Sequence, residues 1–93
     1  MEFEGEYLNG NRWNGKGKEY YSNGKLAFEG EYLNGKANGK GKEYYEQGNM
    51  IYEGGYLYGK RNGKGKEYDN SKLIFEGEYL NGQRNGNGKE YLW

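Results

Sequence analysis

Residues 10–16 read G-x-x-x-x-G-K, the spacing that opens a phosphate-binding loop. In such a loop the backbone N–H groups cradle the phosphates, and a Ser or Thr after the lysine binds the metal ion. Here that next residue is Gly17, and the glycine-rich sequence that follows does not predict the required helix. We therefore interpret this match as part of a turn and not as a nucleotide site.

Side chains that perform catalysis are scarce apart from Glu, Lys and Tyr. The chain has no His, Cys or Thr, its only Asp is Asp69, and its only serines are Ser22 and Ser71. Glu, Lys and Tyr can transfer protons, but here they recur at equivalent positions, whereas a catalytic site needs one asymmetric pocket. Neither a His/Cys cluster for zinc nor an Asp-rich calcium loop is present. The sequence predicts no enzymatic activity, catalytic residue, cofactor or metal site.

Lysines recur along the chain with tyrosines between them, a pattern that could track a nucleic-acid backbone or an anionic lipid surface. The chain contains 14 Lys+Arg and 14 Asp+Glu residues, so no net charge steers it toward either. We favour a solvated face neutralised by glutamates, predict no nucleic-acid partner, and keep phospholipid binding as the alternative. The lysine ladder consists of Lys16, Lys18, Lys40, Lys42, Lys64, Lys66 and Lys89.

Length and composition set the class of protein. With 93 residues and no Cys, the chain forms at most one domain and has no disulfide bond. No apolar run approaches the ~18 residues of a membrane-spanning helix, and no signal peptide is recognisable, so a cytoplasmic location is the default and a membrane-peripheral one the alternative. Aromatic residues make up 18% of the chain, which predicts a core of Tyr and Phe rings.

Near-copies of one unit fill the chain. Phe3, Phe28, Tyr52 and Phe75 open the segments FEGEYLNG, FEGEYLNG, YEGGYLYG and FEGEYLNG. A short turn and then GKGKEY or GNGKEY follow each segment. Repetition at such a period indicates a repeat architecture. We predict a single repeat domain over residues 1–93, with copies at residues 3–27, 28–51, 52–74 and 75–93.

Each copy shows the two-residue alternation of β-strands. Phe3 and Tyr7 fall on one side of the first segment and its glutamates on the other. The connections are short, which makes neighbouring strands antiparallel, and Asn23-Gly24 is a strong hairpin signal. The predicted fold class is all-β: an elongated, single-layer antiparallel meander of about eight strands, built from four stacked β-hairpins.

Glycines recur at fixed positions in these predicted strands, although glycine normally weakens a strand. We expect them to make room for rings, so that Phe28 and Tyr32 lie over Gly30 and over glycines of adjacent strands. The structural rings are Phe3, Tyr7, Phe28, Tyr32, Tyr52, Tyr56, Phe75 and Tyr79. The structural glycines are Gly5, Gly15, Gly17, Gly30, Gly39, Gly41, Gly54, Gly63, Gly65, Gly77, Gly86 and Gly88.

The opposite face is expected to carry charges. Glu29 and Glu31 should neighbour lysines on adjacent strands, where a cross-strand pair contributes ~0.2–1 kcal/mol. Ala27, Ile51 and Ile74 are expected to share this face with a row of leucines. The apolar row fits a partner groove and a minor second core equally well. The leucines are Leu8, Leu33, Leu57 and Leu80.

Departures from the repeat point to assembly. Trp13 adds a large ring to the first turn, and Tyr91, Leu92 and Trp93 give the last strand an apolar end. The end strands of an open sheet present unpaired N–H and C=O groups that invite another chain. We predict assembly or capping roles for these residues and a homodimer formed through the C-terminal copy. The alternative is a monomer in which Trp93 folds back as a cap.

The unit YEGxY-x-x-G-K-x-x-G-K-G, matched from Phe3, Phe28, Tyr52 and Phe75, resembles the membrane occupation and recognition nexus (MORN) repeat. The resemblance covers essentially the whole chain. It implies an elongated sheet of stacked hairpins without enzymatic activity, which serves as a scaffold, a dimerisation unit or a docking surface, and in some members binds phospholipid. Tyrosines stand where the family often has Trp: Tyr7, Tyr32, Tyr56 and Tyr79. Asparagines stand where it often has His: Asn14, Asn38, Asn62 and Asn85.

These observations together predict a non-enzymatic structural scaffold. Its partner is expected to be another protein or a second copy of the chain, bound through a flat ring-lined face and the sheet ends. Peripheral phospholipid binding through the lysine ladder is the alternative function. The low drift between copies is compatible with a natural, an excised or a designed array.

Overall fold

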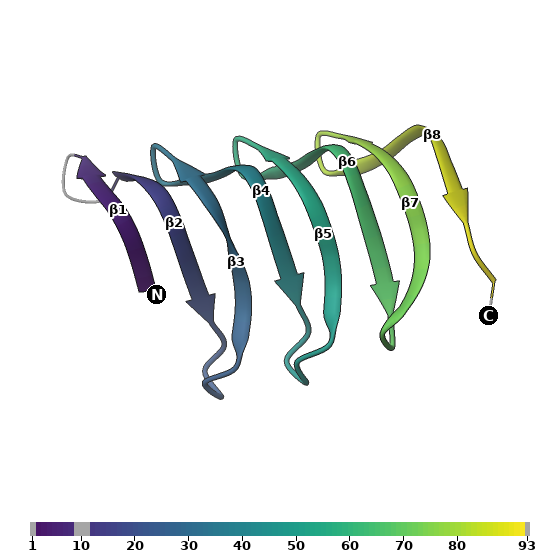
Figure 1. The fold of residues 1–93 in the computed structure, drawn as a ribbon, viewed down its shortest axis with the longest axis horizontal. Helices are drawn as coiled ribbons and strands as arrows, with labels where there is room; N and C mark the ends of the chain where they lie inside the picture. Colours follow the sequence, from purple (N-terminus) through teal and green to yellow (C-terminus); the bar gives the residue numbers. More distant parts are fainter. Residues whose placement is uncertain (1, 9–11, 93) are drawn as a thin grey trace.

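The computed structural model describes the backbone of residues 2–8 and 12–92 and the side chains of residues 14–92. Eight strands form one sheet in sequence order, each antiparallel to the next (Figure 1). This order confirms the predicted all-β meander. The strands are β1 Glu2–Leu8, β2 Arg12–Tyr20, β3 Leu26–Leu33, β4 Lys36–Tyr44, β5 Met50–Leu57, β6 Lys60–Asp69, β7 Lys72–Leu80 and β8 Gln83–Glu90.

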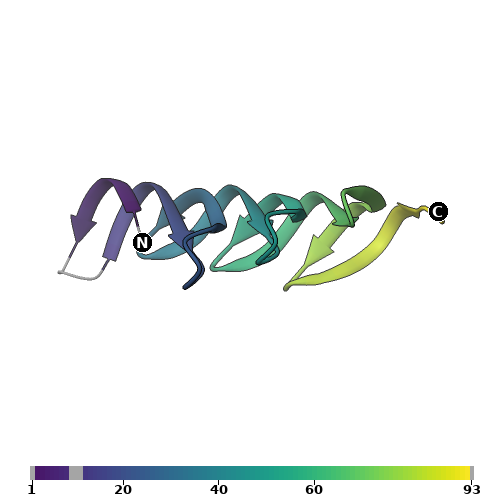
Figure 2. The same ribbon diagram turned by 90° about the horizontal axis from the view of Figure 1, so that it is seen from below.

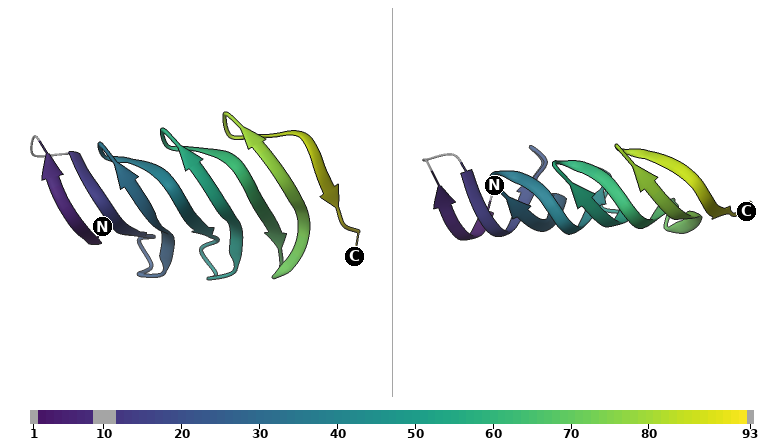
Figure 3. Two further views of the ribbon diagram at one scale, coloured as in Figure 1. Left: turned by 45° about the horizontal axis from the view of Figure 1, so that its top comes forward. Right: turned by 90° about the horizontal axis from the view of Figure 1, so that it is seen from above.

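The sheet is one layer thick and elongated, with β1 and β8 at opposite ends (Figure 1). Its principal extents are 45, 30 and 14 Å. The strands curve strongly when the sheet is seen from below or from above (Figures 2 and 3), in keeping with the twist that antiparallel strands adopt. The expectation of a flat ring-lined face is therefore wrong. No membrane-spanning helix is found in the part of the chain that the structure describes.

A row of glycines crosses the middle of the sheet. Gly30 pairs with Gly17 on one side and with Gly41 on the other. The same pairing continues to the last strand, through Gly54, Gly65, Gly77 and Gly88. Because alternate residues of a strand point to opposite faces, the glycines of this row all turn the same way. We call this the central glycine row.

Aromatic side chains pack on the face toward which the central glycine row turns, here called the ring face. Tyr52 is fully buried, and Tyr32, Tyr56, Phe75 and Tyr79 are each less than 9% exposed. The rings form a continuous chain of near-perpendicular pairs with centroids 5.1–5.7 Å apart, an arrangement that aromatic quadrupoles favour. This chain of rings forms the core of the sheet, and its buried members are all Tyr or Phe.

The turns inside the later copies are two-residue turns with left-handed backbone. Asn34 and Gly35 have φ of 52° and 81°, and Asn81 and Gly82 have φ of 52° and 85°. Positive φ at both central residues is the signature of a type I′ hairpin, whose twist matches that of the strands it joins. These two Asn-Gly pairs therefore fix the hairpins within their copies, whereas at the predicted signal Asn23-Gly24 only the glycine has a left-handed φ, of 86°.

A β-bulge occurs where each copy joins the next, and it leaves Ala27, Ile51 and Ile74 without a residue directly opposite. A bulge interrupts the alternation of faces. Ile51 accordingly packs against the ring core, and Ala27 lines a pocket on the ring face. For these two residues the predicted placement on the charged face is wrong. The strand-end leucines are exposed: Leu33, Leu57 and Leu80.

The first hairpin has its own register. Gly5 pairs with Gly15, whereas in the second copy Gly30 pairs with Gly41, the counterpart of Gly17. The first turn is one residue longer than the others, and the β1–β2 pairing runs without the bulge found in the other hairpins. The longer first turn is thus accompanied by a two-residue shift in the pairing of β1 with β2.

Candidate functional site

The central glycine row allows the rings to lie directly on the backbone. A Cβ atom at Gly41 would stand 2.7 Å from Cζ of Phe28 and 2.8 Å from Cε1 of Tyr56. At Gly65 it would stand 2.4 to 2.6 Å from three atoms of the Tyr52 side chain. Carbon atoms do not approach so closely without a shift of the ring or the strand. The structure therefore places Phe28 and its equivalents over glycines of adjacent strands.

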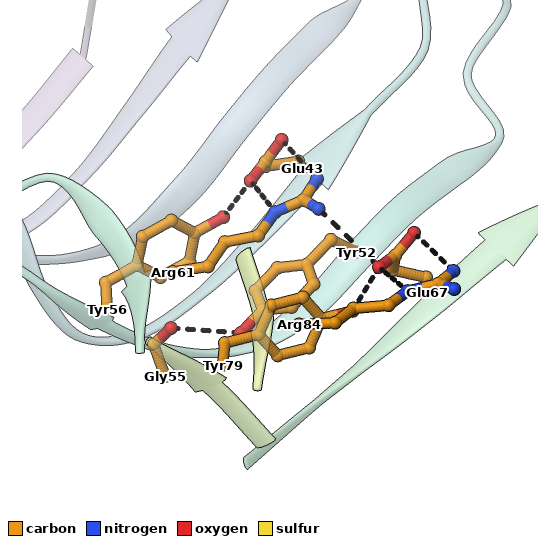
Figure 4. A network of polar contacts seen from close by, with 8 residues as sticks. All are labelled: Glu43, Tyr52, Gly55, Tyr56, Arg61, Glu67, Tyr79 and Arg84. Atoms are coloured by element: carbon orange, nitrogen blue, oxygen red, sulfur yellow. Dashed lines mark hydrogen bonds and ion pairs between the residues drawn. The ribbon is translucent and has the colours of Figure 1, made fainter. Parts of the chain in front are cut away.

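Polar groups on the ring face form a network that links neighbouring copies (Figure 4). The Arg61 guanidinium donates from Nε and Nη2 to the two carboxylate oxygens of Glu43, at 3.0 and 3.1 Å. The Tyr56 hydroxyl donates to the same carboxylate at 2.5 Å. The guanidinium carbon of Arg61 lies 4.3 Å from the centre of the Tyr52 ring. One arginine thus pairs with a carboxylate of the preceding copy and covers a ring of its own.

The same arrangement recurs one copy later. Arg84 donates to Glu67 at 2.9 and 3.2 Å and lies 4.2 Å above the Phe75 ring, and the Tyr79 hydroxyl also donates to Glu67. Burial acts to raise the pKa of Glu67, but the hydrogen bonds from Arg84 and Tyr79 outweigh it and hold this pKa below its ordinary value. We call each such set a Tyr–Glu–Arg network.

Sequence reasoning missed these networks, although a signal was available. Glu43 stands two residues after Gly41, and residues two apart in a strand share a face. The glutamate of each GKGKEY segment therefore had to lie on the ring face, and not with the lysines that flank it. Arginines occur at equivalent positions of the third and fourth copies, Arg61 near the start of β6 and Arg84 near the start of β8.

The tyrosines of the ring face act as neutral hydrogen-bond donors. Burial, followed by the hydrogen bond to Glu43, holds the pKa of Tyr56 far above its ordinary value. Burial is also the main cause that raises the pKa of Tyr52 to about 12, and its hydroxyl donates to the Gly55 carbonyl at 3.0 Å. Such groups keep their protons at neutral pH and serve as fixed structural links.

The other face, here called the charged face, carries rows of alternating charge. Tyrosine hydroxyls donate to its glutamates: Tyr44 to Glu29 at 3.0 Å and Tyr68 to Glu53 at 2.8 Å. Burial and then the bond to Glu29 raise the pKa of Tyr44 to about 12. Among the described side chains, no ion pair within 4.0 Å joins a lysine to a glutamate of this face. The longer row, each member opposite the next, is Lys18, Glu29, Lys42, Glu53, Lys66, Glu76 and Lys89.

A groove of about 1560 Å³ runs along the charged face between two such rows, across β2 to β8. The backbone of the central glycine row forms its floor, because the residues of this row turn toward the ring face, while the charged residues on either side of them form the walls. The second row is less regular: Lys16 lies opposite Glu31 and Lys64 opposite Glu78, but Lys40 lies opposite Gly55. The groove is a concave feature that all four copies share.

Among the remaining predicted site residues, Tyr91 contacts a wall of this groove and Lys16 belongs to one. The Tyr91 hydroxyl donates to Glu76 at 2.5 Å, and Leu92 is 98% exposed. Gly15 and Lys16, which end the phosphate-loop match, belong to strand β2, in agreement with a structural role. The side chains of Phe3, Tyr7, Leu8 and Trp13 and the whole of Trp93 lie outside the described residues, so the structure does not place their rings.

A second set of glycines has a different geometry. Gly39, Gly63 and Gly86 have φ of 109°, 81° and 66°, a left-handed backbone that side chains rarely adopt. Next to Gly39, the Lys40 N–H donates to the Glu31 carboxylate at 2.8 Å.

Within the part of the chain that the structure describes, no group of three or more His, Cys, Asp or Glu residues could hold a metal ion.

Comparison with known proteins identifies the repeat. The model of the MORN repeat matches residues 3–25, 28–50, 52–72 and 75–92. A comparison with curated proteins gives no match. Each of the four matched segments contains one hairpin of the sheet. The chain therefore belongs to the MORN-repeat family.

Proposed function

We propose that this chain is a non-enzymatic scaffold that binds an extended segment of a partner protein in the groove of the charged face. The observation that carries the proposal is the construction of the groove: a floor of glycine backbone between two walls of alternating charge. The volume of about 1560 Å³ exceeds the ~300–1,000 Å³ of ordinary small-molecule sites. A long, shallow and repetitive groove suits a chain molecule better than a compact substrate.

The walls also indicate the chemistry of the partner. In the longer row each lysine lies between glutamates, for example Lys42 between Glu29 and Glu53. A segment with charges of both signs can complement such a wall, whereas a polyanion would meet a carboxylate at every second position. Charge complementarity of this kind gives specificity and orientation more than raw affinity.

The same alternation argues against phospholipid as the main ligand. A polybasic surface gains roughly 1 kcal/mol per Lys or Arg near an anionic membrane, but neighbouring glutamates cancel that gain. We expect little co-sedimentation with phosphatidylserine vesicles at low salt. Binding that is strong at low salt and lost at high salt would favour the lipid function instead, since attraction through lysines is screened by salt.

Peptides selected from a random library against the intact chain test the proposed function. Substitution of groove lysines, in Lys42→Gln and Lys66→Gln, should weaken these peptides roughly tenfold or more, because hydrogen bonds to charged groups are lost. Lys60→Gln provides the matched control, since Lys60 is an exposed lysine outside the groove. Peptides that bind all three variants like the parent chain would contradict a role for the groove.

A further inference from the structure

One position in the second copy breaks the Tyr–Glu–Arg network. Ala37 occupies the place that Arg61 has in the third copy and Arg84 in the fourth. The arginines of the later copies each donate two hydrogen bonds to a glutamate of the preceding copy and cover an aromatic ring. Next to Ala37, Glu19 stands in the place of that glutamate and Phe28 in the place of that ring. Both are present, but the arginine that would contact them is missing.

The missing side chain leaves a pocket of about 460 Å³ on the ring face. Its lining includes Glu19, Phe28, Tyr32, Ala37 and Tyr56. Phe28 is only half-buried, whereas its equivalents under an arginine, Tyr52 and Phe75, are 0% and 5% exposed. Glu19 is likewise exposed, while its equivalents Glu43 and Glu67 are partly covered. The surface left open is the surface that an arginine covers in the next two copies.

The walls of the pocket already have the arrangement found around Arg61. The Phe28 and Tyr56 rings are 5.2 Å apart, and the rings that flank Arg61, Tyr52 and Tyr79, are 5.1 Å apart. The guanidinium carbon of Arg61 lies 4.3 Å from one of these centroids and 5.9 Å from the other.

The carboxylate of the pocket is also held in the same way. The Tyr32 hydroxyl donates to Glu19 at 2.5 Å, just as the Tyr56 hydroxyl donates to Glu43. Among the side chains that the structure describes, none forms an ion pair with Glu19. A ligand would therefore find the carboxylate oriented and the rings in position, with little reorganisation required.

We infer that this pocket binds the guanidinium group of an arginine side chain supplied by a partner protein. The carboxylate of Glu19 accepts two parallel hydrogen bonds from the guanidinium. The flat face of the guanidinium stacks on the Phe28 ring. Lysine is a poor substitute, because an ammonium group offers neither the planar fork nor the stacking surface. The inference goes beyond the proposed function and does not depend on the groove, which lies on the opposite face.

The direct test is a titration of the chain with N-acetyl-arginine amide, followed by the NMR shifts of the backbone amides of Tyr32 and Ala37. The expected result is saturable shifts confined to the pocket. N-acetyl-lysine amide should bind roughly tenfold more weakly, the difference expected from the loss of a charge-assisted hydrogen bond. Equal shifts with the two probes, or no saturation with the arginine probe, would overturn the inference.

Variants of the pocket separate a binding site from a general acidic surface. Ala37→Arg should abolish binding of the probe and raise the melting temperature, because the new side chain can make the contacts that Arg61 makes in the next copy. Glu19→Gln should weaken binding roughly tenfold. Glu90→Gln is the matched control, since Glu90 holds the equivalent position in the last copy and lies outside the pocket. Undiminished binding to Ala37→Arg would refute the assignment even if Glu19→Gln failed to fold.

Discussion

Glycine in the central row is required by packing and opposed by strand propensity. An interior strand glycine costs conformational entropy and offers no side chain to its neighbours. In this sheet the missing Cβ is the contact surface of a ring, as at Gly65 beneath Tyr52. The buried area of the ring compensates for the entropy that the glycine loses. Each central glycine and the ring that lies over it therefore form one packing unit.

Valine in place of a central glycine should destabilise the sheet, even though valine is the better strand former. In Gly30→Val the new Cβ would stand 2.7 Å from the Lys40 carbonyl oxygen, 2.8 Å from Cα of Gly41 and 3.0 Å from the Phe28 ring. Overpacking of this kind costs ~1–3 kcal/mol, to be measured as a lower free energy of unfolding in urea. Lys42→Val, on the charged face, is the control and should change little. A Gly30→Val protein as stable as its parent would refute the ring-over-glycine packing.

Acid should weaken the Tyr–Glu–Arg network of the last two copies. Burial opposes ionisation of Glu67, but its bonds to Arg84 and Tyr79 hold its folded pKa below the ordinary 4.5. The carboxylate therefore contributes stability above that pH, and the contribution is lost as pH falls through the lower folded pKa. In Arg84→Met the thermal stability should fall less steeply below about pH 4.5, while Lys60→Met should keep the parent slope. Identical slopes in all three proteins would show that the network does not couple to folding.

At the scale of the hairpin, the backbone conformation of the turn residues affects the stability of each copy. Asn34-Gly35 and Asn81-Gly82 use the residue pair that tolerates positive φ at both positions. The third copy has Tyr58 at φ 50°, a bulky residue in a left-handed conformation that costs it roughly 1–2 kcal/mol. Its side chain is 71% exposed. Tyr58 is therefore a strained position in an otherwise regular turn.

Tyr58→Asn should raise the stability of the chain by about 1 kcal/mol, since asparagine adopts this conformation more readily. The converse substitution in the last copy, Asn81→Tyr, should lower stability by a similar amount. Both changes are checked by thermal unfolding followed by circular dichroism. If Tyr58→Asn proved neutral or destabilising, turn strain would not explain the position, and a contact of the tyrosine would have to be sought.

Alternation and turn chemistry made the strands predictable, because each acts within a few residues. For example, Phe28 and Gly30 are two residues apart, so their shared face follows from the alternation of a strand. The bulges at Ala27 and Ile51 were not predicted, since a bulge depends on how two copies meet and leaves no local signature. The pairing of Arg61 with Glu43 was missed for the same reason: it joins residues of different copies and arises only once the sheet is assembled.

At the scale of the molecule, the open sheet ends at two unpaired edges. β8 is exposed along its whole length, and Leu92 beyond it is 98% exposed. We predict that two chains associate through β8, because an edge strand presents unpaired N–H and C=O groups with which another strand can pair. Light scattering at ~100 μM should show a dimer, because at that concentration even a dimer of micromolar affinity is largely formed.

A charge beside that edge should oppose the association. Leu92→Lys is expected to shift the chain toward monomer, because charged residues blunt sheet edges. Leu33→Lys is the control, since Leu33 is an exposed leucine at the end of an interior strand. A parent chain that stays monomeric at ~100 μM would contradict the predicted dimer.

The shape of the whole molecule places the proposed contact surface. The groove of the charged face is shared by successive copies, so its length should grow with the number of repeats. Each added copy contributes another pair of charged wall positions, so affinity for an extended segment should increase along the array. A scaffold built in this way recognises its partner by several weak, repeated contacts.

The most direct test of the proposed scaffold function is an NMR shift map of the chain with a peptide selected for binding to it. The shifted amides are expected to follow the groove, from Lys18 and Lys42 to Lys66 and Lys89, while the side-chain ring signals of Tyr52 and Phe75 on the opposite face stay unchanged. A map confined to the ring face or to β8 would contradict the groove as the contact surface.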